Sequence, residues 1–189
     1  MTDAPATPKR GAVRRVLAVG ERFLAIVGLF FLVYHFCFRI EHMSTGSMSP
    51  TLKGYESGRP DWVLIEKPTY WFRRPRRWEV AHVRLNDGTL VAKRIAALPG
   101  ERITIQDRRV CINGVPQPPP GSVPYLKYVG VGNLWKERSF QCSDRGFFVL
   151  GDGMDSLDSR YEGEIDVDRI RGRILMRVWP PRRIAFLTP

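Results

Sequence analysis

Apolar residues are concentrated in one long run near the N-terminus. Residues 23–38 read FLAIVGLFFLVYHFCF, contain no Asp, Glu, Lys or Arg, and are closed by Arg22 and Arg39. Flanking arginines can extend their charged ends to water, and the apolar character continues upstream. We therefore predict a transmembrane anchor over residues 16–40.

Two other interpretations of this run are disfavoured. A cleaved secretory signal ends in small residues of the Ala-x-Ala type, whereas this run ends in Cys37-Phe38-Arg39. A core helix in a small protein rarely carries leucine and aromatic residues on every face. An uncleaved membrane anchor remains the favoured interpretation.

Basic residues upstream of the run predict its orientation. The positive-inside rule places the basic tail, residues 1–15, in the cytoplasm. The body, residues 41–189, then lies on the extracytoplasmic side of the cell (inner) membrane. The basic residues are Lys9, Arg10, Arg14 and Arg15, opposed only by Asp3 and Glu21.

Beyond the anchor, short apolar runs are separated by turn signals such as Asn86-Asp87-Gly88 and Asn113-Gly114. No long segment of helical period follows, and 15 Pro and 17 Gly favour turns. Pro116–Pro124 is expected to be an extended loop. We predict a mainly β domain preceded by one transmembrane helix. The predicted strands are Asp61–Lys67, Glu79–Leu85, Leu90–Leu98, Arg102–Gln106, Arg109–Ile112, Gly146–Gly151 and Arg171–Trp179.

The formal net charge of +11 raises the question of a nucleic-acid partner. The arginines are scattered, and no zinc-finger spacing, RNA-binding signature or recognition helix is visible. Anionic lipid headgroups are the alternative partner of this charge. The aromatic and basic cluster 70–74, YWFRR, also suits a membrane interface. We expect the lipid bilayer, and no nucleic acid, as a partner.

The chain has three cysteines and no CxxC pair, so a zinc site is not expected. Cys37 lies in the predicted anchor. Cys111 and Cys142 form one disulfide in an oxidising compartment, or they are two unpaired buried thiols. Sequence spacing does not decide between these alternatives.

A segment rich in hydroxyl residues follows the anchor. Residues 44–52 read STGSMSPTL. Gly46 and Pro50 favour a tight turn, on which Ser47 can present its hydroxyl to a cleft. The same composition is typical of a plain linker.

Lys93 interrupts an apolar stripe in the sequence VAKRIAALPG, residues 91–100. On a strand, Lys93 shares a face with Val91 and Ile95. Burial of an ammonium group lowers its pKa, and a neutral amine can act as the base for a serine nucleophile. The alternative is an edge-strand lysine whose ammonium reaches water.

Residues 147–160, FFVLGDGMDSLDSR, run from an apolar strand into a polar turn. Asp158 and Arg160 could form an ion pair that fixes the conformation of that turn. Ser156 could form a hydrogen bond with Lys93. The spacing fails the calcium-binding EF-hand pattern, and a plain structural turn stays open.

A histidine base is disfavoured by position. His35 lies in the predicted anchor, His42 at its boundary, and His82 in the middle of a predicted strand. A Ser–His–Asp site is therefore less favoured than a Ser–Lys pair.

These segments, in this order, resemble the type I signal peptidase (leader peptidase) family over about residues 44–180. One such motif is weakly specific, whereas several in order behind an anchor are strongly so. The matching segments are 47–52 (Ser-Met-x-Pro-Thr-Leu in the family), 77–80 (Arg-Gly-Asp-Val), 93–100 (Lys-Arg-…-Leu-Pro-Gly), 151–160 (Gly-Asp-Asn-…-Asp-Ser-Arg) and, in the closing strand, 172–173 and 179–180.

The resemblance implies roles by position. Ser47 would be the acylated nucleophile, and Lys93 the general base and later the acid. The Thr45 hydroxyl and the Ser47 backbone N–H would stabilise the oxyanion. Ser156 matches the serine that orients the lysine. Structural roles fall to Asp152 and to an ion pair of Asp158 and Arg160.

The sequence also departs from the family pattern. Gly153 stands where Asn is usual, and the loop before Ser156 is shorter than the common pattern. Thr45 stands where Ser is common, which keeps the hydroxyl and adds a methyl group. The resemblance implies that Met48 and Ala92 line the shallow substrate pockets beside the nucleophile.

The activity implied by the resemblance is a membrane-anchored serine endopeptidase. It would remove signal peptides from exported preproteins after small residues, with no metal or organic cofactor. Two alternatives stay open: a specialised processing peptidase of a conjugative-transfer or secretion system, and a catalytically inactive membrane-anchored scaffold.

Overall fold

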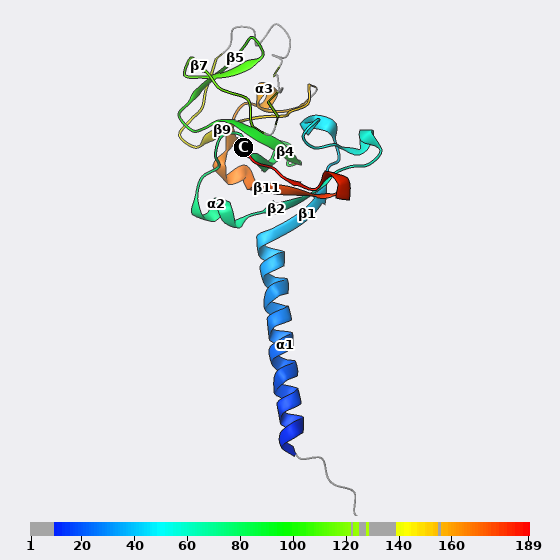
Figure 1. Ribbon diagram of the computed structural model, residues 1–189. Coiled ribbons are helices and arrows are strands. Elements are labelled where there is room, and N and C mark those ends of the chain that lie inside the picture. The colour runs from blue at the N-terminus through cyan, green and yellow to red at the C-terminus, as the bar shows by residue number, and fades with distance from the viewer. Residues whose placement is uncertain (1–9, 122, 125–127, 129–138, 155) are drawn as a thin grey trace, which may run out of the picture. The chain divides into compact units, whose positions relative to one another are not determined.

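The structure of the chain, a computed structural model, describes residues 10–121, 123–124, 128, 139–154 and 156–189. The chain divides into two compact units, one up to Phe38 and one from Arg39 to Pro189. Figure 1 shows the helix α1 of the first unit and the strands of the second. The mainly β fold preceded by one apolar helix is confirmed.

The first unit is the helix α1, Arg10–Cys37. Its segment Gly11–Cys37 has 27 residues, contains an 18-residue window with a mean hydropathy of 2.2, and is long and apolar enough to cross a membrane. The helix begins before the predicted range 16–40, so part of the predicted tail is helical. It ends before residue 40 because the chain enters a strand at Phe38.

The larger sheet of the second unit has the strand order β1-β2-β11-β3-β4-β9-β10, and β12 pairs with β11. Neighbouring strands from β2 to β10 pair antiparallel along this path. The strands are β1 Phe38–His42, β2 Trp62–Glu66, β3 Val80–Arg84, β4 Leu90–Ala97, β9 Gly146–Leu150, β10 Ile165–Asp166, β11 Ile170–Trp179 and β12 Ala185–Phe186.

The smaller sheet is antiparallel, with the order β7-β6-β5-β8. Apolar side chains of β5 and β6 form one buried cluster with Phe148 and Leu150 of β9, so the two sheets share a core. The strands are β5 Arg102–Gln106, β6 Arg109–Ile112, β7 Val115–Pro116 and β8 Phe140–Gln141.

A second hydrophobic cluster holds the chain that follows Ser47. Met48 and Leu52 are at most 1% exposed and pack with apolar residues of β2, β3 and β11. Full burial of such a side chain contributes roughly 1.5–3 kcal/mol. The hydroxyl-rich segment is therefore fixed to the sheet, which is not the behaviour of a plain linker.

The predicted turns have the backbone that their sequences favour. Gly88 and Gly114 have φ of 86° and 82°, in the left-handed region that glycine tolerates best. Asp87 accepts hydrogen bonds from the Thr89 N–H and hydroxyl, each 2.8 Å long. The resulting β3–β4 hairpin places Ala81 opposite Lys93.

All seven predicted strands are present, each within one residue at either end. Five further strands carry no signal in the sequence: β7, β8, β10 and β12, because two-residue strands have no period, and β1, because it continues the apolar run. The short helices are α2 Pro68–Phe72, α3 Ser159–Glu162, η1 Gly46–Met48, η2 Tyr55–Ser57, η4 Val167–Arg169 and η5 Pro181–Arg183.

Candidate active site

Ser47 lies in the 3-10 turn η1. This turn begins at Gly46, directly after Thr45, whose backbone is extended. The Ser49 N–H donates to the Gly46 carbonyl and the Leu52 N–H to the Met48 carbonyl, each at 2.8 Å. The Thr45 hydroxyl donates to Ser47 Oγ at 3.2 Å. The tight turn thus presents two neighbouring hydroxyls from one short segment.

The loop after β9 packs directly on this turn. The Gly153 N–H donates to the Ser47 carbonyl at 2.9 Å. A Cβ on Gly153 would lie only 2.6 Å from the Gly46 carbonyl oxygen, closer than carbon and oxygen pack. The family that the sequence resembles usually has Asn at this position. The side chain of Asn would not fit against the Gly46 carbonyl, which gives a physical reason for Gly153.

Lys93 lies in the middle of β4 and is 1% exposed. Burial lowers the pKa of its ammonium from 10.5 to about 8, and the Asp158 carboxylate opposes this shift. The alternative of an edge-strand lysine is wrong, because β4 lies between β3 and β9. A lysine with this pKa is partly neutral near neutral pH.

Ser47 and Lys93 line the same cavity, which has a volume of about 750 Å³. Thr45 and Gly153 line it as well, so the hydroxyl pair and the loop after β9 meet there. Apolar side chains complete part of the wall. These are Leu85, Val91, Met154 and Leu157.

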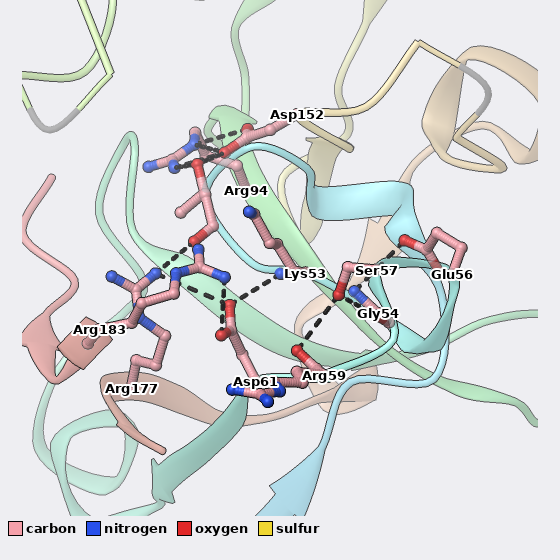
Figure 2. Close-up of polar contacts among 11 residues, drawn as sticks. Lys53, Gly54, Glu56, Ser57, Arg59, Asp61, Arg94, Asp152, Arg177 and Arg183 are labelled. Carbon is pink, nitrogen blue, oxygen red and sulfur yellow. Dashed lines mark hydrogen bonds and ion pairs between the residues drawn. The ribbon is translucent and has the colours of Figure 1, made fainter. Parts of the chain in front are cut away.

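Asp152, which lines the cavity, forms an ion pair with Arg94 in which both side chains are buried, with Arg94 Nη2 2.7 Å from Asp152 Oδ2 (Figure 2). Arg94 Nε also donates to both carboxylate oxygens, and Nη1 donates to the Trp78 carbonyl at 2.8 Å. The Thr51 hydroxyl donates to the same carboxylate at 2.5 Å. This network joins β4 to the segments that carry Ser47 and Gly153.

A second charged group holds the far end of the Ser47 segment. Arg177 Nη1 donates to the Thr51 carbonyl at 2.7 Å. Asp61 accepts from the Lys53 N–H at 2.8 Å and from Arg183 Nη1 at 2.8 Å (Figure 2). Two separate buried carboxylates, Asp61 and Asp152, therefore restrain the chain just after the candidate nucleophile.

Asp158 and Arg160 form a buried ion pair at the start of α3. Arg160 Nε and Nη2 donate to the carboxylate of Asp158, each at 2.8 Å. Asp158 also accepts the Gly151 N–H at 2.8 Å and caps α3 by accepting the Arg160 N–H. Asp158 therefore connects Gly151, at the end of β9, to the start of α3.

The Ser156 side chain does not make the hydrogen bond that was expected of it. It is 1% exposed, and its Oγ has no hydrogen-bond partner among the residues that the structure describes. The predicted hydrogen bond to Lys93 is therefore not formed. Ser156 Oγ instead packs so closely against Gly151 that a Cβ there would overlap it.

Met48 and Ala92 do not lie where the resemblance implied. Neither is among the residues that line the cavity. Met48 is 1% exposed and Ala92 6% exposed, and both belong to the hydrophobic cluster beneath the site. Ala92 points away from the cavity because it alternates with Val91 and Lys93 along β4.

The histidines of the second unit lie outside this cavity. His82 Nε2 is 3.2 Å from a Glu41 carboxylate oxygen, and burial lowers the pKa of the imidazole. The ring of His42 packs on Tyr55 and Trp62. The structure therefore brings neither of these histidines to Ser47.

Both cysteines of the domain are unpaired. Cys111 and Cys142 are free and buried, which corresponds to the second of the two alternatives. Burial raises the pKa of the Cys142 thiol to about 12. The thiol is thus protonated and unreactive at neutral pH.

Sequence reasoning missed Arg94, Thr51 and Tyr128. The Tyr128 hydroxyl lies 3.4 Å from Asp152, and its ring stacks on Trp78 at 6.4 Å between centroids. One signal was present: adjacent basic residues on a central strand point to opposite faces, so Arg94 needed a buried acidic partner of its own.

Comparisons with known proteins identify the family of the chain. The model of the family described as "Signal peptidase, peptidase S26" matches residues 16–179. The protein named probable signal peptidase I-2 of Synechocystis sp. is 27% identical over 180 residues, covering 91% of this chain and 77% of the relative. Signal peptidase I of Bacillus caldolyticus is 30% identical over 148 residues, covering 74% of this chain and 79% of the relative.

A crystal structure of a signal peptidase I from Enterococcus faecalis is also similar, with a TM-score of 0.43 and 27% identity, over 53% of this chain and 97% of that one. The family model includes the Ser47 turn, strand β4 and the loop after β9. On that match, the chain belongs to the signal peptidase, peptidase S26, family of serine proteases.

Proposed function

We propose that the chain is a membrane-anchored endopeptidase that removes signal peptides from exported preproteins, with Ser47 as nucleophile and Lys93 as general base. One observation carries the proposal. A lysine that is 1% exposed, with its pKa lowered to about 8, lines the same cavity as a serine on a tight turn. A serine hydroxyl is a weak nucleophile and needs such a base.

The residues support a two-step acyl transfer. Ser47 Oγ attacks the scissile carbonyl and gives its proton to Lys93 Nζ, which passes it to the leaving amine. A water then attacks the acyl-enzyme, with Lys93 again taking the proton and Ser47 recovering it. The Thr45 hydroxyl, which donates to Ser47 Oγ in the free protein, turns to the oxyanion together with the Ser47 backbone N–H.

The substrate class rests on the relatives and on the helix. Those relatives are named signal peptidases. The helix α1 is long and apolar enough to span a bilayer, and Arg10, Arg14 and Arg15 lie near its N-terminal end. We place the N-terminus in the cytoplasm and the peptidase domain on the extracytoplasmic side of the inner membrane. A signal peptide then reaches the site where it leaves the bilayer.

The test is cleavage of a preprotein with an Ala-x-Ala site by the detergent-solubilised full chain, with N-terminal sequencing of the product. We expect a cut after the last Ala, and no cleavage by Ser47→Ala or Lys93→Met. Ser49→Ala, which removes a neighbouring hydroxyl from the same cavity, is the matched control and should keep activity. Full activity of either dyad variant would contradict the proposal.

A further inference from the structure

A second cavity, of about 390 Å³, shares no lining residue with the active-site cavity. Leu90 of β4 lines this second cavity, and the next residue, Val91, lines the active-site cavity. Successive side chains of a strand point to opposite faces. The two cavities therefore lie on opposite faces of β4.

Fixed positive charge surrounds this second cavity. Arg39, Lys67, Arg84 and Arg171 line it, and none of its lining residues is an Asp or Glu. Glu41, close by, is already paired with Arg39 at 2.5 Å and with His82 at 3.2 Å.

The other three cations are uncompensated. Lys67, Arg84 and Arg171 take part in no ion pair within the part of the chain that the structure describes. Several unpaired cations around a concave site attract an anion. Guanidinium groups in particular match the oxygen atoms of a phosphate.

The surroundings indicate an amphipathic anion. Trp71 lines the cavity and is 60% exposed, and the next residue, Phe72, is 87% exposed. Exposed aromatic residues beside basic ones are typical of a membrane interface. Arg39, which lines the cavity, comes only two residues after the end of α1 at Cys37 in the sequence.

We propose that this cavity binds the phosphate headgroup of an anionic phospholipid, with Lys67, Arg84 and Arg171 contacting the phosphate and Trp71 the glycerol and upper acyl chain. The proposal rests on the membrane anchoring proposed above. A bound headgroup ties the peptidase domain to the bilayer surface through the face of β4 that is opposite to Lys93.

The test uses the full chain in phosphatidylcholine nanodiscs that contain a trace of photoactivatable phosphatidylglycerol or, separately, photoactivatable phosphatidylcholine. Crosslinked peptides are identified by mass spectrometry. We expect phosphatidylglycerol to label peptides containing residues 65–72 and 82–90 far more than phosphatidylcholine does. Each arginine near the membrane surface raises the affinity for an anionic lipid by about fivefold. The double variant R84Q/R171Q should therefore lower the labelling of these peptides by phosphatidylglycerol by about 30-fold.

The matched control is R108Q/R109Q, which removes the same charge from exposed positions at the β5–β6 turn and should leave the labelling unchanged. Peptides of α1 should be labelled equally by both probes in every variant. If neither probe labelled the peptides of α1, the proposed membrane anchoring would be refuted, independently of the headgroup site. Equal labelling of 65–72 by both probes, or no loss in R84Q/R171Q, would overturn the headgroup site. Loss of labelling on addition of inorganic phosphate would show a site for free phosphate and overturn the lipid assignment.

Discussion

Arg94 and Asp152, which are 58 residues apart in the chain, form an ion pair whose two side chains are fully buried, with their closest atoms 2.7 Å apart. The pair connects the residue after Lys93 to the residue before Gly153, whose N–H holds the Ser47 carbonyl. It therefore joins the strand of the proposed base to the turn of the proposed nucleophile.

Removal of one partner should be strongly destabilising. Asp152→Leu leaves a buried guanidinium without its carboxylate, and we expect a loss of about 3–5 kcal/mol in the free energy of unfolding. Replacement of both residues, R94M/D152L, leaves no unpaired buried charge. The double variant should therefore lose less free energy of unfolding than D152L does. Denaturant unfolding of the full chain in detergent measures both. A double variant less stable than D152L would contradict this view of the pair.

The Thr45 hydroxyl should matter for the chemical step. Thr45→Val keeps the shape of the side chain and removes the donor, so we expect kcat to fall by about 10²–10³-fold with little change in KM. Thr45→Ser retains the donor and should stay within a few-fold of the wild type. Steady-state kinetics on a preprotein measure both constants. Equal kcat values for the Val and Ser variants would exclude an oxyanion role for this hydroxyl.

Lys93 should reduce stability at neutral pH. Its pKa falls from 10.5 in the unfolded chain to about 8 in the folded one, so below pH 8 the folded state carries the full cost of a buried ammonium. Lys93→Met should therefore be more stable than the wild type at pH 7, by about 3 kcal/mol at most. The advantage should shrink between pH 8 and pH 10.5, as the folded state releases its proton first. Denaturant unfolding of both proteins at several pH values tests this, and a difference independent of pH would contradict it.

Trp78 has φ of 68°, which glycine tolerates and bulky residues rarely adopt. The conformation is held by hydrogen bonds of its N–H and carbonyl to Ile95 and Arg94, each at 2.8 Å. A side chain in this region costs roughly 1–2 kcal/mol. Trp78→Gly should therefore be more stable than Trp78→Ala by about 1 kcal/mol, the reverse of the usual order.

The matched control for Trp78 is Trp62 in β2, which has an ordinary strand backbone. There Trp62→Ala should be more stable than Trp62→Gly by roughly 0.5–1 kcal/mol. Thermal or denaturant unfolding of the four variants gives the comparison. The same Ala-over-Gly order at both positions would show that the backbone of Trp78 is not strained.

Much of the fold was predictable because its signals are local. The β3–β4 hairpin follows from alternating apolar residues on either side of Asn86-Asp87-Gly88, and α1 from an uninterrupted apolar run. The burial of Lys93 was predictable as well, because its neighbours Val91 and Ile95 mark a buried face. These features depend on residues that are close together in the sequence.

The rest of the site depends on contacts between distant segments. The partner of Arg94 is 58 residues away, and Tyr128 reaches Asp152 from a proline-rich region with no period of its own. The orientation of Ser156 depends on how closely its loop packs on Gly151, which no pattern of residue types records. Met48 is buried because η1 turns it into the core while Ser47 faces the cavity.

The pH dependence of kcat/KM for preprotein cleavage tests the central claim most directly. A lysine base must be neutral to accept the proton of Ser47, and the pKa of Lys93 is lowered to about 8. The rate should therefore rise about tenfold per pH unit below pH 8 and level off above it, with a single apparent pKa near 8. A rate that is flat from acid to neutral pH, or that rises with a histidine-like pKa near 6.5, would contradict the assignment of Lys93 as the base.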